Sequence, residues 1–459
     1  MFTAKNYREL LRLFAAFVLP AVGSQLLSGI YTIVDGYFVG WGMGEQGLAA
    51  IGLAFPFTVV ITAAGAGIGV GGGALLAMSS GRKRKPLTER LLGSMVFMAA
   101  MASLFCVIVL TPSAAWLLSR YEVGPVVGAM AQRYSLILFI FAPAQVFTMA
   151  MLGAVRNDGF PKRAMYIMIL SFCVNIVLDW LWVIVFPFGI DGAAWATGIS
   201  QLVSAALLSG HFIYGGSRVK LRRALIKPCR ALSAKVTLMG FSPFGVQIAT
   251  AVSMILYNWQ ALAYGGDMGV AAYAVIGYIV PVGVMLEEGI AEGMQPLISY
   301  FHGARLAASR RLTERIGFTC SVAAGLFCTL LVFISAGLIP EFFSMTGKAA
   351  EVATEGLLLS APVFAFLGIA KSGASCYQAT GHSLRASILT YADPFILQPL
   401  YLWTLPLFFG LDGVWLSLCA ANVTLAALFC IMWRSTRAKH RVRGGIKLAP
   451  TRQGQTEAE

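Results

Sequence analysis

YIMILSFCVNIVLDWLWVIVFPFGIDGAAWATGIS, residues 166–200, contains an apolar segment of membrane length, a break at Pro187 and Gly189, and the start of a second apolar segment. Asn175 and Asp179 are four residues apart in the first segment, so a helix places both on one face. A carboxylate inside the hydrocarbon part of a bilayer costs roughly 2.5–3.5 kcal/mol on insertion scales. Asp179 therefore needs a partner or a function.

The composition indicates a polytopic, all-α membrane protein. Of the 459 residues, 58% are hydrophobic and 12% are charged, whereas soluble domains have about 45–50% and about 25%. Apolar stretches long enough to cross a bilayer recur along the chain. They predict twelve transmembrane helices, at about 13–40, 48–80, 90–118, 132–154, 164–187, 192–214, 239–263, 270–300, 316–339, 353–377, 386–409 and 413–434.

The net charge of +14 is a topology signal. All of the 34 Lys and Arg except Arg120, Arg133, Lys348 and Lys371 fall in segments that are cytoplasmic if the N-terminus is inside. This is the positive-inside pattern. We therefore expect a multi-pass protein of the cell inner membrane with both termini in the cytoplasm. Its basic segments face the lipid bilayer, and no nucleic acid is expected as a partner.

The sequence repeats itself at an offset of 221–225 residues, which indicates a duplicated six-helix unit. Because six spans is an even number, the two halves have the same orientation, with a pseudo-two-fold axis along the membrane normal. The predicted organisation is an N-terminal lobe (1–214), a basic linker (215–238), a C-terminal lobe (239–435) and a tail (436–459). The matches are Pro20/Asp35 with Pro243/Asn258, 88–90 with 313–315, 104–106 with 326–328, and 189–192 with 410–413.

Two intramembrane carboxylates belong to the first lobe alone, because Asp35 aligns with Asn258 and Asp179 aligns with the 400–401 region. At 1.5 Å per residue, Asp35, Asp179 and Thr197 all lie about 8–15 Å below the outer surface. Together with Asn175 they form an oxygen-rich site that suits a hard cation or shared protons. The alternatives are that Asp35 lies at the water interface and that Asp179 serves packing only.

The acids of the second lobe lie elsewhere. Glu287, Glu288 and Glu292 occupy the eighth span, which continues to Gln295. Glu288 and Glu292 share a helix face, and we predict a cleft that attracts organic cations. The alternative is that some of these carboxylates reach water at the end of the span.

Lys371 and Asp393 are also confined to the second half. Each is eleven residues from His382, in the loop that joins their helices, so they lie at equal depth. The prediction is a structural ion pair, and the alternative is a role in coupling.

These features resemble the multidrug and toxic compound extrusion (MATE) transporters, in particular the prokaryotic DinF-like branch. The resemblance covers residues 10–435. It rests on the two six-helix lobes, on Pro20, Tyr31 and Asp35 in the first span, on the spacing of Asn175, Asp179 and Thr197, and on the ending of the eighth span around Gln295–Pro296 and Gly303–Ala304.

The resemblance implies a cation-coupled antiporter that exports amphipathic, often cationic, organic compounds and so confers multidrug or antibiotic resistance. It implies a coupling site for H⁺ or Na⁺ at Asp35 and Asp179, with Asn175, Thr197 and the nearby Tyr31, and a bend of the first helix at Pro20. Some branches place carboxylates on the seventh and tenth spans, where this chain has Asn258 and Lys371.

The alternative function is a flippase or exporter of a lipid-linked precursor on the same two-lobe fold, but a pyrophosphate needs a cationic cleft. An intramembrane protease is disfavoured, because the Gly-x-Gly-Asp type of motif is missing. We therefore expect a transporter and not an enzyme, functional as a monomer and without a tightly bound cofactor.

Overall fold

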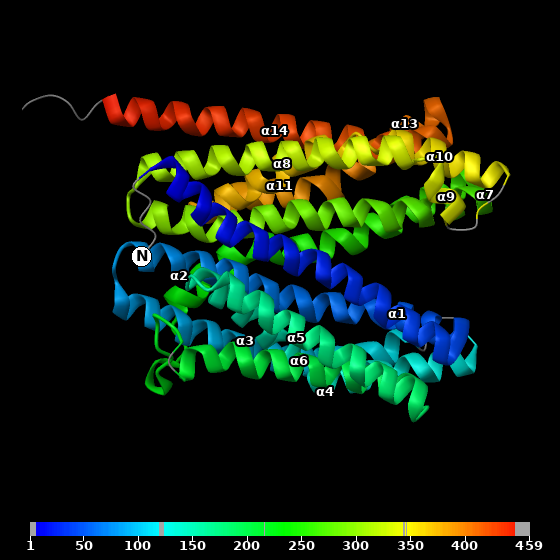
Figure 1. The fold of residues 1–459 in the computed structure, drawn as a ribbon, viewed down its shortest axis with the longest axis horizontal. Helices are drawn as coiled ribbons and strands as arrows, with labels where there is room; N and C mark the ends of the chain where they lie inside the picture. Colours follow the sequence, from blue (N-terminus) through cyan, green and yellow to red (C-terminus); the bar gives the residue numbers. More distant parts are fainter. Residues whose placement is uncertain (1–5, 119–123, 215, 343–344, 346, 446–459) are drawn as a thin grey trace, which may run out of the picture.

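The computed structural model describes residues 6–118, 124–214, 216–342, 345 and 347–445, and these form helices and connecting turns with no strand among them. They build two helical bundles that lie side by side (Figure 1). The elements are α1 (Tyr7–Ala66), η1 (Gly67–Gly71), α2 (Gly72–Gly81), α3 (Lys85–Leu118), α4 (Pro125–Asn157), α5 (Pro161–Asp179), η2 (Trp180–Val185), α6 (Gly189–Ile213), η3 (Arg223–Leu225), α7 (Arg230–Gly303), α8 (Ala307–Ser335), α9 (Leu338–Phe342), α10 (Lys348–Ser360), α11 (Val363–Ala379), α12 (Ser383–Ala392), η4 (Asp393–Leu397), α13 (Gln398–Phe409) and α14 (Leu411–Gly445).

These helices supply the twelve predicted membrane crossings. Within the described ranges, nine are long and apolar enough to span a bilayer, and α10 and α11 form a tenth span that is bent by 45°. The 74 residues of α7 fold back at Gly266 and provide two crossings. The eleventh span of the chain is α12, η4 and α13 together. The twelve-helix, two-lobe prediction is therefore confirmed.

The duplication is visible in the backbone. Gly44 and Gly266 are 222 residues apart and have φ of +62° and +54°, at the turn between the first two spans of each lobe. Glycine tolerates positive φ because it lacks a Cβ. Three more pairs of positive-φ residues follow the same offset within one residue: Lys83 with Arg305, Gly159 with Gly381, and Gly189 with Gly410.

The first helix of each lobe crosses to the other lobe. α1 begins against the upper bundle in Figure 1 and ends in the lower one. Phe14 and Phe17 near its start share a buried core with Met294 of α7. Met239 near the start of α7 packs against Met78 of α2 in return. The two lobes therefore exchange their first turns in the packing, and the predicted boundary at residue 214 stays a prediction.

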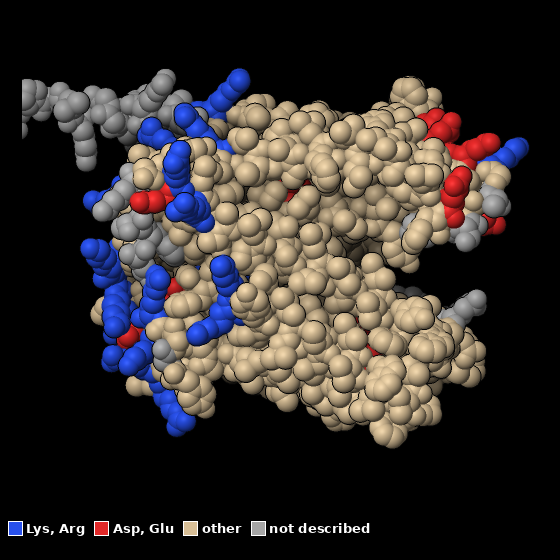
Figure 2. Space-filling model, viewed as in Figure 1, with Lys and Arg blue, Asp and Glu red and all other residues tan. Residues whose placement is uncertain are grey.

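Glycines bring the two lobes into backbone contact. A Cβ added to Gly240 would lie 2.3 Å from the carbonyl oxygen of Gly67, and one added to Gly303 would lie 2.1 Å from that of Met78. The Gly-rich run at 65–73 therefore serves close helix packing. Lys and Arg gather at the end of the molecule where Gly303 lies, and a hollow separates the lobes at the opposite end (Figure 2).

The linker and the tail differ from the predicted boundaries. The predicted linker 215–238 is helical from Arg230 onward, where α7 begins. Its earlier part lies on the N-terminal lobe, because Arg222 Nε is 3.1 Å from Glu89 Oε2 and Ser217 Oγ donates to Asp158 Oδ2 at 2.8 Å. In the predicted tail 436–459, α14 continues to Gly445, and residues 446–459 lie outside the described residues.

Candidate ion-coupling site

The two carboxylates of the N-terminal lobe meet inside the bundle. Asp35 comes from α1 and Asp179 is the last residue of α5, and their carboxylates are close enough to interact electrostatically. Asp179 is fully buried. Asp35 is half-exposed. This arrangement agrees with the predicted common depth of the two residues, and their role in ion coupling stays a prediction.

An amide and a hydroxyl complete the predicted set. Asn175 lies one turn before Asp179 and is also fully buried. Its Nδ2 is 3.5 Å from Oγ1 of Thr197 on α6. Buried polar groups normally have hydrogen-bond partners, yet Asn175 Oδ1, Asp35 Oδ1 and both oxygens of Asp179 have none among the described residues. The site therefore has unused acceptors that point inward.

Two tyrosines border the carboxylates. Tyr31 stacks on Phe172 with ring centroids 4.9 Å apart, and its hydroxyl lies beside Thr197. Tyr134 of α4 is 5% exposed and also lies beside Thr197, in electrostatic contact with Asp35 and Asp179. The sequence analysis missed Tyr134. Its place opposite Asp179 depends on how α4 packs against α1 and α5, and no spacing within the chain encodes this.

The site lacks a basic partner. Of the ion pairs formed by the described residues, none includes Asp35 or Asp179. The six residues after Asp179 form the π-helical turn η2, a distortion that occurs frequently at functional sites. Two facing carboxylates without a counter-charge can hold a proton or a small cation between them.

Pro20 lies inside α1, fifteen residues before Asp35. Proline removes one backbone donor from a helix and weakens it locally. Ser24 Oγ donates to the carbonyl oxygen of Pro20 at 2.8 Å. Because the first turns of α1 pack on the C-terminal lobe and Asp35 lies in the N-terminal lobe, Pro20 lies in the segment that joins them.

The acids of the eighth span do not form one anionic surface in this structure, and their role in binding organic cations stays a prediction. Glu287 is 1% exposed, and Glu288 forms an ion pair with Lys371. Glu292 forms an ion pair with Arg156 of α4, in the other lobe. Gln295 accepts from Asn157 Nδ2 at 3.3 Å and donates to the carbonyl oxygen of Val70 at 3.3 Å. Glu287 and Glu288 face α11, whereas Glu292 and Gln295 face α4 of the other lobe, because α7 is packed on several sides at this level.

The predicted pair of Lys371 and Asp393 is wrong. Lys371 Nζ is 2.5 Å from Glu288 Oε1, and Asp393 Oδ2 accepts instead from Gln398 Nε2 at 3.0 Å. The sequence places Lys371 and Asp393 at the same depth, but Glu288 of the eighth span lies nearer to Lys371 than Asp393 of the eleventh span does. The sequence analysis also missed Arg156, which it assigned to a cytoplasmic basic segment.

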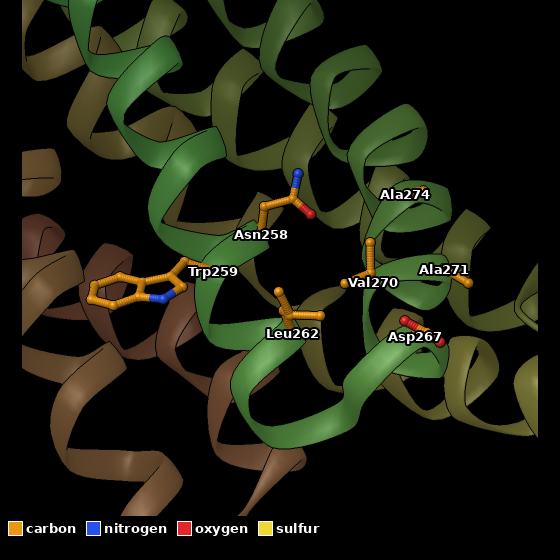
Figure 3. Close-up of a pocket in the computed structure, with 7 residues that line it drawn as sticks. All are labelled: Asn258, Trp259, Leu262, Asp267, Val270, Ala271 and Ala274. Carbon is orange, nitrogen blue, oxygen red and sulfur yellow. The ribbon is translucent and has the colours of Figure 1, made fainter. Parts of the chain in front are cut away.

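Two open pockets lie near the outer turns, away from the predicted cleft residues. The pocket in Figure 3, about 520 Å³, lies between the two arms of α7 next to the fold-back at Gly266. Asn258, the repeat equivalent of Asp35, lines it together with Trp259 and Asp267. The second pocket is lined by Trp182, Trp195 and the paired Arg133 and Asp191, among others.

The sequence model of the MatE family matches residues 20–181 and 244–399, one segment in each lobe. The chain belongs to the MatE family. MatE proteins are membrane transporters and not enzymes, so this chain is a transporter. The predicted DinF-like branch is a finer assignment and stays a prediction.

Individual MatE proteins agree over nearly the whole chain. Multidrug export proteins MepA from Staphylococcus saprophyticus and Staphylococcus aureus are each 24% identical, over 424 and 418 residues, which is 91% of this chain and 92% of theirs. The solved structure of a multidrug resistance MATE family transporter in an outward-facing conformation has a TM-score of 0.88 at 22% identity and covers 95% of this chain and 99% of its own. The likeness to that structure establishes the fold.

Proposed function

We propose that this MatE transporter is a secondary-active antiporter that exports amphipathic, cationic organic compounds in exchange for protons. The observation that carries the proposal is the proximity of Asp35 to the fully buried Asp179 in one lobe, with no basic residue paired to either. Two ionised carboxylates at this distance repel each other strongly in a medium of low dielectric constant. A single shared proton removes that repulsion, so loading and unloading of the proton changes the energy of this lobe.

Alternating access supplies the link to cargo. The lobes touch at the Lys- and Arg-rich end and separate at the other end (Figure 2). The positive-inside rule supports a cytoplasmic location of the touching end, with both termini inside and the hollow open to the outside of the cell inner membrane as parts of this proposal. α1 connects Asp35 with the core of the C-terminal lobe through Pro20. A change of protonation at Asp35 can therefore alter how the lobes meet, within a monomer.

The cargo assignment rests on the relatives, because Glu288 and Glu292 are ion-paired and Glu287 is buried in this conformation. The curated relatives are multidrug export proteins. Organic cations are the chemical class that carboxylates and aromatic side chains attract. Sodium is the alternative coupling ion, because the cage of Asp35, Asp179, Asn175 and Thr197 offers oxygen ligands to a small cation as well as to a proton.

The test uses the purified protein in liposomes, with uptake of tetraphenylphosphonium as the readout and with pH and Na⁺ gradients imposed separately. We expect the pH gradient alone to drive uptake and the Na⁺ gradient alone to be ineffective. Uptake driven only by Na⁺ would overturn the assignment of the coupling ion. No gradient-driven flux with either ion, for a protein that is folded and correctly inserted, would overturn the antiporter.

A further inference from the structure

The C-terminal lobe contains a group of charges that the site of the N-terminal lobe does not use. Lys371 of α11 forms its ion pair with Glu288 of α7. The same ammonium interacts electrostatically with Glu287 of α7 and with Asp393 at the start of η4. Three carboxyl groups therefore surround one cation, and the group would carry a net charge of −2 if all four members were ionised.

Glu287 and Asp393 lack the partners that an ionised carboxylate needs inside a membrane. Both oxygens of Glu287 are buried without a hydrogen-bond partner among the described residues, although Ser321 of α8 lies beside it. Its Oε2 lies 2.4 Å from where a Cβ of Gly368 would be, so the carboxyl group is pressed against the backbone of α11. Asp393 accepts one hydrogen bond, from Gln398, and its Oδ1 is buried without a partner.

Among the described residues, Lys371 is the one cation that interacts with Glu287 or Asp393. Glu292, the remaining acid of the eighth span, is neutralised by Arg156. The other titratable side chains that face the group are neutral: the thiols of Cys320 and Cys328 near Glu287, and the phenol of Tyr257 near Asp393. A carboxylate whose oxygens are buried without partners is strongly destabilised when ionised. This applies to Glu287 and to the Oδ1 side of Asp393, so both residues need protons of their own.

The ion pair of this group is partly exposed. The side chains of Lys371 and Glu288 are 24% and 25% exposed, so their pair lies at the edge of the lobe and not in a sealed interior.

Asp393 is the first residue of the π-helical turn η4. In the N-terminal lobe a π-helical turn, η2, follows Asp179 directly. The fifth helix of each lobe thus carries an aspartate at a π-helical turn, although sequence alignment pairs Asp393 with Ser171.

We propose that Lys371, Glu287, Glu288 and Asp393 form a second proton-binding group in the C-terminal lobe, in which Glu287 and Asp393 hold exchangeable protons while Glu288 stays ionised beside Lys371. This group goes beyond the exchange at Asp35 and Asp179, and it binds protons whether or not those residues couple transport. The total number of protons bound per molecule is then larger than one lobe can account for.

Infrared difference spectroscopy of the full-length protein tests the proposal without a transport assay, because protonated carboxyl groups have a separate carbonyl-stretch band. In an Asp35→Asn/Asp179→Asn background we expect a band that disappears as the pH is raised. Adding Glu287→Gln should remove one part of it, and adding Asp393→Asn should remove another. Glu351→Gln, at an exposed position on α10, is the matched control and should leave the band unchanged.

Lys371 provides a second, opposite test. Lys371→Met should add a carboxylic-acid band at neutral pH, because Glu288 loses its counter-charge and takes up a proton, and Glu288→Gln in the same background should cancel it. Lys371→Arg keeps the positive charge beside Glu288 and should add no carboxylic-acid band. It therefore tests the role of the charge even if Lys371→Met fails to fold. A background band that is absent, or that neither Glu287→Gln nor Asp393→Asn reduces, would overturn the proposal. So would a band that does not respond to pH.

Discussion

Arg156 of α4 and Glu292 of α7 form an ion pair that joins the two lobes. The side chains are 11% and 29% exposed, and the next residue of α4, Asn157, donates to Gln295 one turn further along α7. These contacts lie on the closed side of the molecule, opposite the hollow. A carrier that opens alternately to each side has to break them in every cycle.

Neutralising either partner should favour opening of the Lys- and Arg-rich end. Arg156→Gln or Glu292→Gln leaves one charge unpaired where the lobes touch, and that charge gains hydration when they separate. Spin labels at Lys85 and Ala308, in a background free of native cysteines, should show a longer distance in both variants. The charge exchange Arg156→Glu/Glu292→Arg should restore the short distance. Unchanged distances in both single variants would show that the pair does not hold the lobes together.

The affinity for organic cations should differ between the same two variants, Arg156→Gln and Glu292→Gln. If Glu292 binds cationic cargo in the inward-open state, Arg156 competes with that cargo. Arg156→Gln should then tighten binding of tetraphenylphosphonium and Glu292→Gln should weaken it, each about tenfold, or roughly 1.4 kcal/mol. A neutral compound of similar size should bind equally to both variants. Equal changes for the cation would mean that Glu292 holds the lobes together but does not bind cargo.

The backbone contacts at the glycines between the two lobes leave no space for an added side chain. A Cβ on Gly240 would lie 2.3 Å from the backbone oxygen of Gly67, which cannot rotate away. Gly240→Ala should therefore separate the lobes at the touching end and lengthen the same spin-label distance. Gly277→Ala, also on α7 but with nothing within 4 Å of the added atom, is the control. A folded Gly240→Ala variant with the wild-type distance would contradict the importance of this contact.

The fold was predictable because the thickness of the bilayer sets the length of each apolar run and because the internal repeat is visible in the order of the residues. Apolar runs set the spans, and the offset of 221–225 residues set the two lobes. The exchange of α1 and α7 between the lobes was not predictable. Phe17 and Met239 are apolar residues, and an apolar residue in the sequence does not indicate against which of the two bundles it packs. The tenth and eleventh spans, bent or broken in the structure, also read as single apolar runs.

The candidate site was predictable in part. Asn175, Asp179 and Thr197 lie on consecutive helices with a short connection, so depth and helix period place them together. The prediction of the ion-pair partner in the second lobe was wrong, because the depth of a residue in the membrane does not determine how its helix is rotated about its axis. Lys371 at the level of both Glu288 and Asp393 could pair with either, and only the packing of α11 against α7 decides it.

The ion pair of Lys371 can be tested by double-mutant cycles. Lys371→Met or Glu288→Gln should each destabilise the fold by about 3 kcal/mol, because each leaves a charge without its partner in the membrane. The double variant should recover most of this loss. A second cycle with Lys371→Met and Asp393→Asn should be closer to additive. Apparent melting temperatures of the purified variants provide the measurement, and stronger coupling in the second cycle would favour the pair with Asp393.

The carboxylates of the N-terminal lobe should be indispensable for exchange and dispensable for folding. Asp35→Asn or Asp179→Asn replaces one of two facing acceptors with an amide that donates to the other, so the pair no longer needs a shared proton. We expect pH-driven efflux to fall to the level of protein-free liposomes while the melting temperature at neutral pH is maintained. Tyr134→Phe, which removes a hydroxyl beside Thr197, should reduce the rate without abolishing it. Tyr37→Phe, at an exposed position on α1, should transport normally. A well-folded Asp179→Asn variant with wild-type efflux would remove this pair from the mechanism.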